Sequence, residues 1–457
     1  MVNKHISQLS WACSIKDGEY DFTIGRSVDH SDDFLFEGVW DGEYKTKDIH
    51  KTDFAYGSGA RLAQDVVIFV PPKHCFDYLY VIHDKENNVT VVSNSPNLAL
   101  VQAGVDPQGE FLKEVVGKIR DTTDEATAVG FDRYEQKVTE NKRYVFYRMM
   151  FYNFTVDGNG SFKIINTKPM RYFKDFQGYK EFMSTKIRLF AENGSDKSRI
   201  SPLDPITLIS SGYDSPCIAA LATSLGYKEA ATIDVNVKGV NDSGEDIANK
   251  LGMNVVTVGH ILGDNLESLT SEFKGDKAKE LAEFFATTGF GDNVMLKTFE
   301  DILTNKIYLS GAMGDAVWRR ACVLEPGLPT GITYNKSSTE FRLRVGYAFV
   351  PVGAIGARFV WPIKILNKSK EMADYILWEP YDRPFPRRVI EESGIERGTF
   401  AKKKAATNPT VTNYSDLAEP SFKIIMDKYR SSLSMTNKHG LKLLSNLKKY
   451  INMNKGV

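Results

Sequence analysis

A short stretch of serines, a glycine and an aspartate, Ser210 to Ser215, has the residue types of a phosphate-binding loop. Gly212 permits a backbone conformation in which successive amide groups point towards an anion. The serine hydroxyls add further hydrogen-bond donors. We therefore predict that pyrophosphate binds to Ser210, Ser211, Gly212, Tyr213, Asp214 and Ser215.

Asp214 is an unusual residue for a loop that binds bare phosphate, because like charges repel. It makes sense if a divalent cation lies between its carboxylate and the phosphate. The loop also lacks the Gly-Lys-Ser/Thr ending of an ordinary P-loop. The residues favour a site for pyrophosphate with Mg²⁺, in which Asp214 is a metal ligand.

A second loop with glycines and an aspartate follows the predicted strand Lys306 to Ser310, and it reads GAMGD. Asp315 at its end would be the second carboxylate of a two-point magnesium clamp that begins with Asp214. Gly311 and Gly314 would line the same site. The expected cation is Mg²⁺.

The first loop resembles the Ser-Gly-Gly-x-Asp-Ser pyrophosphate loop of the asparagine synthetase family and of other enzymes that split ATP into AMP and pyrophosphate. Ser211 stands where that pattern has its first glycine. The second loop resembles the family's Ser-Gly-x-Gly-x-Asp-Glu signature, with Ser310, Gly311 and Asp315 in register. The resemblance implies a doubly wound α/β domain that binds MgATP.

The second loop also departs from the family pattern. Ala312 stands where asparagine synthetases carry a glutamate and the β-lactam-forming relatives a tyrosine. Met313 replaces a glycine, and Ala316 replaces the final glutamate. Adenylation stays plausible with these residues, but the usual acid/base chemistry at position 312 cannot operate.

Further candidates follow the predicted strands. Asp234 ends the second strand, where the resemblance implies that the chain runs close to adenosine. Asp242 and Glu245 begin the next helix and could reach ribose or substrate, or could simply oppose the helix dipole.

Glu340 belongs to a stretch, Glu340-Phe341-Arg342, that resembles the Glu-x-Arg residues lining the family's acceptor pocket. Glu340 could bind an amine or act as a base, with Arg342 or Arg344 binding an anion. The alternative is a surface strand of alternating charge.

Three adjacent lysines, Lys402 to Lys404, could supply a cation for charge that develops on phosphorus. In the family a lysine after the late helices has this role. Register favours Lys404, with Lys403 as its neighbour among the predicted catalytic residues. A solvated turn is the alternative reading.

The elements that position these loops alternate between strand and helix. Helical spacing predicts a helix after the first loop with Ser215 as N-cap, and another over Asp175 to Asn193. The predicted strands are Ile206–Ser210, Ala230–Val235, Asn254–Val258 and Lys306–Ser310. We predict an α/β fold, a doubly wound parallel sheet of the pyrophosphate-loop type, with ligand at the carboxyl ends of its strands.

Residues 1 to 170 show strand-like alternation and turn signals instead. Predicted elements include Phe34–Trp40, Val66–Val70, Asp77–Ile82, Val89–Ser93 and a hairpin from Tyr144 to Ile165. In the asparagine synthetase family this region is a glutaminase domain with an N-terminal cysteine nucleophile. Val2 stands there in this chain, and the nearest cysteine is Cys13. We therefore expect a β-rich, glutaminase-like domain that does not hydrolyse glutamine. The alternative is an unrelated β domain.

The predicted domains are 1–170, the ATP-pyrophosphatase domain 171–410, and a basic helical tail 411–457, with a homodimer possible. Lys plus Arg and Asp plus Glu number 58 each, so net charge gives no argument for nucleic acid. The cysteines lack metal-site spacing, and no apolar run is long enough to cross a bilayer. We expect a cytoplasmic protein.

The expected activity is ATP-dependent adenylation of a small carboxylic acid, followed by amide formation with ammonia or an amine. Two alternatives stay open. One is a pyrophosphate-loop enzyme that modifies RNA, and the other is a non-catalytic descendant that binds nucleotide.

Overall fold

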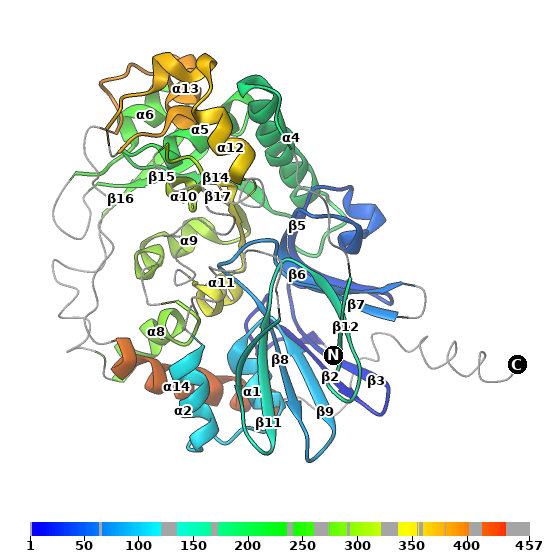
Figure 1. Cartoon of the computed structure of the whole chain (residues 1–457). Coiled ribbons are helices and arrows are strands. Elements are labelled where there is room, and N and C mark those ends of the chain that lie inside the picture. Colours follow the sequence, from blue (N-terminus) through cyan, green and yellow to red (C-terminus); the bar gives the residue numbers. More distant parts are fainter. Residues whose placement is uncertain are drawn as a thin grey trace, which may run out of the picture.

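The computed structural model of the chain describes residues 2–63, 66–119, 135–165, 172–234, 241–259, 273, 275–289, 293–320, 337–353, 355, 360–379, 381–401 and 414–435 (Figure 1). Lys403 and Lys404 lie outside these residues, as do the predicted boundary near residue 170 and the tail beyond residue 435.

The first part of the chain folds into two β-sheets that pack face to face. Within the described residues one sheet has the strand order β1-β3-β2-β9-β8-β11-β10 and the other β13-β12-β7-β6-β5-β4. The first sheet is built from β1 (Val2–Asn3), β2 (Trp11–Lys16), β3 (Glu19–Gly25), β8 (Leu79–Asp84), β9 (Val89–Ser93), β10 (Glu135–Glu140) and β11 (Tyr144–Met149). The second is built from β4 (Asp29–Ser31), β5 (Phe34–Trp40), β6 (Ala55–Ala63), β7 (Val66–Val70), β12 (Asn153–Val156) and β13 (Phe162–Ile165).

Side chains alternate between two cores along these strands. Trp11, Cys13 and Ile15 of β2 belong to the core between the two sheets, whereas Ala12 belongs to the core that contains Leu98. This follows from the two-residue period of a strand. Helix α1 (Pro96–Gln102) packs on β2, β8 and β9, and α2 (Glu110–Lys118) packs on β10. Short 3₁₀ turns, η1 (Tyr44–Thr46) and η2 (Ile49–Lys51), follow β5.

A five-stranded sheet, counted over the described residues, forms the second part of the chain. Its order is β16-β15-β14-β17-β18, and every neighbouring pair is parallel. The strands are β14 (Asp204–Leu208), β15 (Glu229–Ile233), β16 (Asn254–Val258), β17 (Lys306–Ser310) and β18 (Ala348–Pro351). The order reverses between β14 and β17, so the loops that follow these two strands emerge side by side.

Apolar cores lie against both faces of this sheet. Ile307 and Leu309 of β17 belong to the larger core, whereas Tyr308 between them packs against another that includes Phe284 and Phe299. The helices of this part are α4 (Phe176–Gly194), α5 (Asp214–Ser224), α6 (Glu245–Lys250), α8 (Gly275–Phe285), η4 (Val294–Phe299), α9 (Glu300–Leu303), α10 (Gly314–Val317), α11 (Thr339–Val345), α12 (Val360–Asn367), η6 (Lys370–Tyr375) and α13 (Pro384–Glu392). Figure 1 shows the sheet between α5 and α13 above it and α8 and α9 below.

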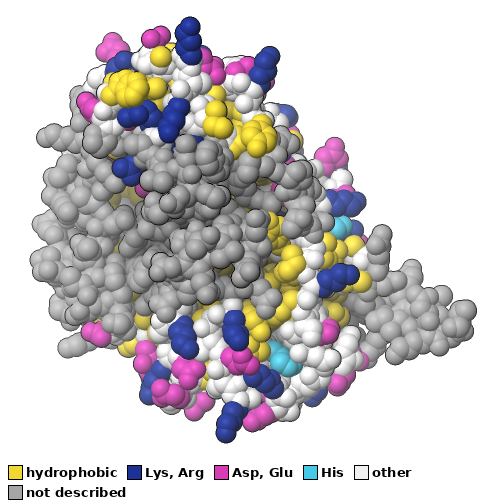
Figure 2. Space-filling model, in the orientation of Figure 1, with side chains coloured by type: hydrophobic (Ala, Val, Ile, Leu, Met, Phe, Trp, Pro, Cys, Tyr) yellow, Lys and Arg dark blue, Asp and Glu magenta, His cyan; other side chains and the backbone are white. Residues whose placement is uncertain are grey.

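Helix α14 (Tyr414–Ser434) joins the two parts by packing against α8 of the second part and α1 and α2 of the first (Figure 1). Acidic and basic side chains are interspersed over the described part of the face in Figure 2. Among the described residues, no helix combines the length and the apolarity needed to cross a membrane.

The predicted parallel sheet, with helices between its strands, is confirmed, as is the mainly β character of the first part. The strand over Lys306–Ser310 has the predicted bounds, and Asp175 caps the long helix α4 by accepting from the Gly178 amide at 2.8 Å. Strand β18 was missed, although its apolar run lies between Gly346 and Gly353.

Two local predictions were wrong. The hairpin predicted from Tyr144 to Ile165 is only β12 and β13, because Tyr144–Met149 pairs with β8 and β10 in the other sheet. The strand predicted from Asp77 begins at Leu79. In the first case local alternation cannot tell which sheet a strand joins.

A buried ion cluster links the two parts. Arg342 of α11 contacts Glu37 of β5 at 2.6 Å and Asp77 at 3.1 Å, and all three side chains are nearly inaccessible to water. His74 lies 4.0 Å from Asp77 and accepts from the Phe76 amide at 3.1 Å. The neutral imidazole therefore fits this site, because its second nitrogen can hold the proton that faces Asp77.

Protonation of His74 at low pH should lower the free energy of unfolding. Burial lowers the pKa of His74 to about 4 in the folded chain, whereas an unfolded histidine has a pKa of about 6.5. Between these values the unfolded state binds a proton that the folded state does not bind. The free energy of unfolding should therefore fall by roughly 3 kcal/mol on this account as the pH falls through that window.

Urea unfolding at a series of pH values measures how the free energy of unfolding depends on pH. Between pH ~6.5 and ~4 the free energy of unfolding should change less steeply with pH in His74→Asn than in the wild type. Asparagine keeps an acceptor for the Phe76 amide. His5→Asn is the matched control, since His5 is exposed and outside the cluster. Equal slopes for all three proteins would contradict the prediction.

Candidate functional site

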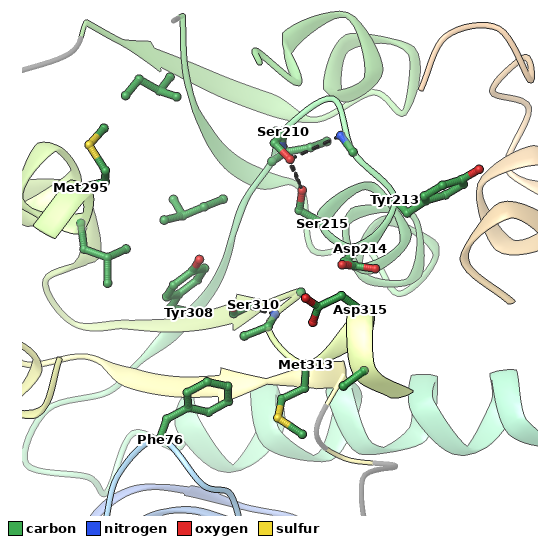
Figure 3. Close-up of a pocket in the computed structure, with 18 of the residues that line it drawn as sticks. Phe76, Ser210, Tyr213, Asp214, Ser215, Met295, Tyr308, Ser310, Met313 and Asp315 are labelled. Atoms are coloured by element: carbon green, nitrogen blue, oxygen red, sulfur yellow. Dashed lines mark hydrogen bonds between the residues drawn. The ribbon is translucent and has the colours of Figure 1, made fainter. Parts of the chain in front are cut away.

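The first loop connects β14 to α5 and has an internal hydrogen-bond network. The Ser210 amide donates to Ser215 Oγ at 2.9 Å, and the two hydroxyls lie 3.0 Å apart (Figure 3). The Gly212 amide points towards Ser210 Oγ at 3.4 Å. The predicted N-cap role of Ser215 is wrong, because α5 begins at Asp214 and Ser215 lies in its first turn.

Ser211 turns away from this network. Its hydroxyl donates to Asp242 Oδ1 at 2.6 Å, and its amide donates to the Asp242 carbonyl at 3.1 Å. Ser210 forms a bridge with Ser243 just beyond. Asp242 thus fixes the outer side of the loop in the free chain.

The second loop lies directly against the first. A Cβ on Gly314 would lie 2.6 Å from the carboxylate of Asp214, and one on Gly311 would lie 2.8 Å from the Asp214 backbone. Real Cβ contacts are never so short, so only glycine permits this approach. The two loops meet because β14 and β17 are neighbours in the sheet, with Thr207 opposite Leu309.

Asp214 and Asp315 line one cavity of about 370 Å³. Figure 3 shows the two carboxylates close together, one on α5 and one on α10. Ser210, Gly212 and Ser215 line the same cavity. The amides of residues 210 to 212 donate within the chain, so the arrangement offers two carboxylates for a divalent cation beside the hydroxyls of Ser210 and Ser215. In the described part of the chain, no group of three or more His, Cys, Asp or Glu side chains forms a metal cluster.

Arg383 was not among the predicted site residues, yet it borders the cavity and donates to the Asp214 carboxylate. Burial lowers the pKa of Arg383, but Asp214 and other nearby groups outweigh that effect and raise the pKa overall. Its guanidinium also lies over the Tyr381 ring. Burial raises the pKa of Tyr381 to about 12, so its hydroxyl stays protonated.

Arg387, from the same segment, donates to the Tyr213 hydroxyl and lies over its ring. Tyr213 is therefore held by α13, and it also lines the cavity. The run YDRPFPRR carries the only local signal for these contacts, a cluster of cations and aromatic rings beside prolines.

Glu340 occupies a separate, buried site. It accepts hydrogen bonds from Ser95 at 2.5 Å, Asn97 at 2.8 Å and Tyr429 at 2.9 Å. Burial raises the pKa of Glu340 above its usual range, against the effect of these donors. The stretch is the helix α11 rather than the surface strand considered as the alternative, and Glu340 packs against the first part of the chain.

The neighbouring arginines have internal partners as well. Arg342 is held by the ion cluster described above, and Arg344 pairs with Glu283 at 2.6 Å and Glu300 at 2.5 Å. Asp234 is exposed at the end of β15, where its amide donates to the Val258 carbonyl at 3.4 Å.

The remaining wall of the cavity is apolar and was not predicted. It is formed by Phe76, Leu208, Ile233, Met295, Leu296, Phe299, Tyr308, Ala312 and Met313, among others. Phe76 is notable because it comes from the β-rich first part of the chain. A scan of protein-family models and a search of curated proteins gave no match to this chain.

Adding a methyl group at Gly314 should disturb the site. In Gly314→Ala the new Cβ would overlap the Asp214 carboxylate and the Trp318 ring, each at 2.6 Å. We expect the free energy of unfolding to fall by about 1–3 kcal/mol, the usual cost of overpacking. Urea unfolding of the purified variant measures the change.

The matched control is Gly117→Ala in α2, where a Cβ meets nothing within 4 Å. That change should be neutral or slightly stabilising, because alanine favours helix. If Gly314→Ala were as stable as the control, Asp214 could not lie against this glycine.

Proposed function

We propose that this chain is an ATP-dependent ligase that adenylates a substrate carboxylate, releases pyrophosphate and then forms an amide with ammonia or an amine. The observation that carries the proposal is the cavity that Asp214 and Asp315 share. It lies where the strand order of a parallel sheet reverses, which is a common place for ligands in open α/β sheets. The resemblance of both loops to the asparagine synthetase family supports the same chemistry.

Charge explains why a cation belongs in this proposal. Two unit charges 4 Å apart repel by about 4 kcal/mol at an effective dielectric constant of 20. Two aspartates beside a triphosphate would therefore oppose binding unless a cation lies between them. Asp214 and Asp315 fit Mg²⁺, which in nucleotide sites uses one or two carboxylates together with substrate phosphates. Mg²⁺ would neutralise charge on the phosphates.

The described residues have complementary roles in this scheme. Ser210, Gly212 and Ser215, at the N-terminus of α5, would bind the pyrophosphate portion of ATP. Arg383 adds positive charge at the same edge of the cavity. Lys404, or its neighbour Lys403, would stabilise charge on the α-phosphorus and is proposed on the resemblance alone.

In each step of the proposed reaction, the bond that forms is matched by a bond that breaks. An oxygen of the substrate carboxylate bonds to the α-phosphorus, while the bond from that phosphorus to the bridging oxygen breaks and pyrophosphate leaves. The amine nitrogen then attacks the acyl carbon and loses a proton, and AMP leaves with the electron pair of the acyl–oxygen bond. Adenylation supplies the leaving group that a free carboxylate lacks.

The nitrogen is proposed to come from free ammonia or an amine rather than from glutamine. Cys13 is wholly buried in β2, and burial raises the pKa of its thiol well above the usual range. A buried, protonated thiol is a poor nucleophile. The β-rich part would then act as a scaffold and as one wall of the site.

Exchange of labelled pyrophosphate into ATP, measured with a panel of carboxylic acids and Mg²⁺, tests the first step. Asp214→Asn and Asp315→Asn should each lower exchange at least about 100-fold, since each removes a ligand worth several kcal/mol of charge stabilisation. Asp246→Asn is the matched control, because Asp246 is exposed in the first turn of α6.

Undiminished exchange in Asp214→Asn would contradict the assignment of the metal ligand. Pyrophosphate release that required RNA would favour a base-modifying enzyme. Binding of MgATP without release, whatever the acceptor, would favour a nucleotide-binding descendant.

A further inference from the structure

The cavity is divided into a charged end and an apolar end. Figure 3 shows Ser210, Ser215, Asp214 and Asp315 above, with Met313 and Phe76 below them. Ala312 and Met313 belong to the second loop, and Phe76 reaches the same cavity from the first part of the chain. These three residues are called the apolar wall below.

Phe76 is held rigidly in this wall. Its ring packs edge-on against Phe349 of β18, with centroids 5.5 Å apart, and only 3% of the residue is exposed. Its backbone amide is fixed by His74 of the ion cluster. A rigid aromatic side chain is a preorganised apolar contact, since it loses little conformational entropy when a ligand binds.

Met313 has an unusual backbone conformation. Its φ of 72° lies in the left-handed region, which glycine adopts freely and methionine does not. The side chain at this position is therefore held with some backbone strain. That side chain lines the cavity, and its sulfur lies 3.5 Å from the Cys75 sulfur.

Position 312 is apolar as well, because Ala312 offers only a methyl group to the cavity. Residues 312 and 313 thus present apolar atoms next to the carboxylates. A polar amino acid such as aspartate would leave its charged groups unpaired against this wall.

We propose that the acid accepted by this cavity has an unbranched or aromatic apolar body, which packs on Phe76, Ala312 and Met313 while its carboxylate faces the two loops. Met313 is the proposed specificity-determining residue, because its side chain lines the cavity on the same loop as Asp315. That the acid is a substrate rests on the proposed adenylation. That an acid with an apolar body binds is inferred from the lining of the cavity alone.

A series of straight-chain acids from butanoate to decanoate, with aspartate and succinate as polar probes, tests the wall by isothermal titration calorimetry. The titrations contain Mg²⁺ but no nucleotide, because a carboxylate that faces Asp214 and Asp315 without a cation would be repelled. Each buried methylene should tighten binding about fourfold until the wall is filled. Phe76→Ala should reduce the gain in affinity for each added methylene. Met313→Gly should shift the preferred acid to longer chains, and it should still fold because glycine relieves the left-handed strain.

Met313→Leu is the matched control, since it keeps an apolar side chain of similar size. This variant should keep the wild-type preference for chain length. Circular dichroism of each variant confirms that it is folded. If affinity did not rise with chain length, or if aspartate bound more tightly than hexanoate, the inference would be overturned.

Pyrophosphate exchange with the same acids separates this inference from the proposed function. Exchange with aspartate or succinate but not with the apolar acids would overturn the apolar wall and leave adenylation intact. Tighter binding of longer acids without exchange for any acid would support the wall and overturn adenylation.

Discussion

The approach of the Asp214 carboxylate to two glycines of another loop is the constraint on which the candidate site depends. Gly311 and Gly314 have no room for a Cβ, because the first loop occupies that space. Such contact is possible only between loops that leave neighbouring strands at the same edge of a sheet. The reversal of strand order between β14 and β17 therefore creates the site, and the glycines allow it to close.

Charge balance is the second requirement of this arrangement. A carboxylate that is removed from water needs a cation or several donors, because its desolvation costs several kcal/mol. In the free chain Arg383 supplies that cation for Asp214. In the proposed function a divalent cation with a nucleotide meets the same need at the two aspartates, and Arg383 would then share its partner.

The β-rich part of the chain belongs to the site rather than only supporting it. The segment that carries His74 and Asp77 is fixed by the buried Arg342, and Phe76 lies between them in sequence. Breaking a buried ion pair of this kind usually costs about 3–5 kcal/mol. The position of Phe76 in the cavity is therefore tied to a buried ion cluster between the two parts.

The sequence by itself determined many of the local elements and singled out Asp214 and Asp315, which line one cavity in the structure. Strand periodicity and turn residues were enough for Lys306–Ser310, and residue types were enough to select Asp214 and Asp315, because these signals are local. Only the tertiary structure decided that Arg383 pairs with Asp214, that Glu340 lies in a separate buried network, and that Phe76 reaches the cavity. Each of these depends on contacts between segments far apart in the chain, which packing of the whole molecule selects and no local pattern encodes.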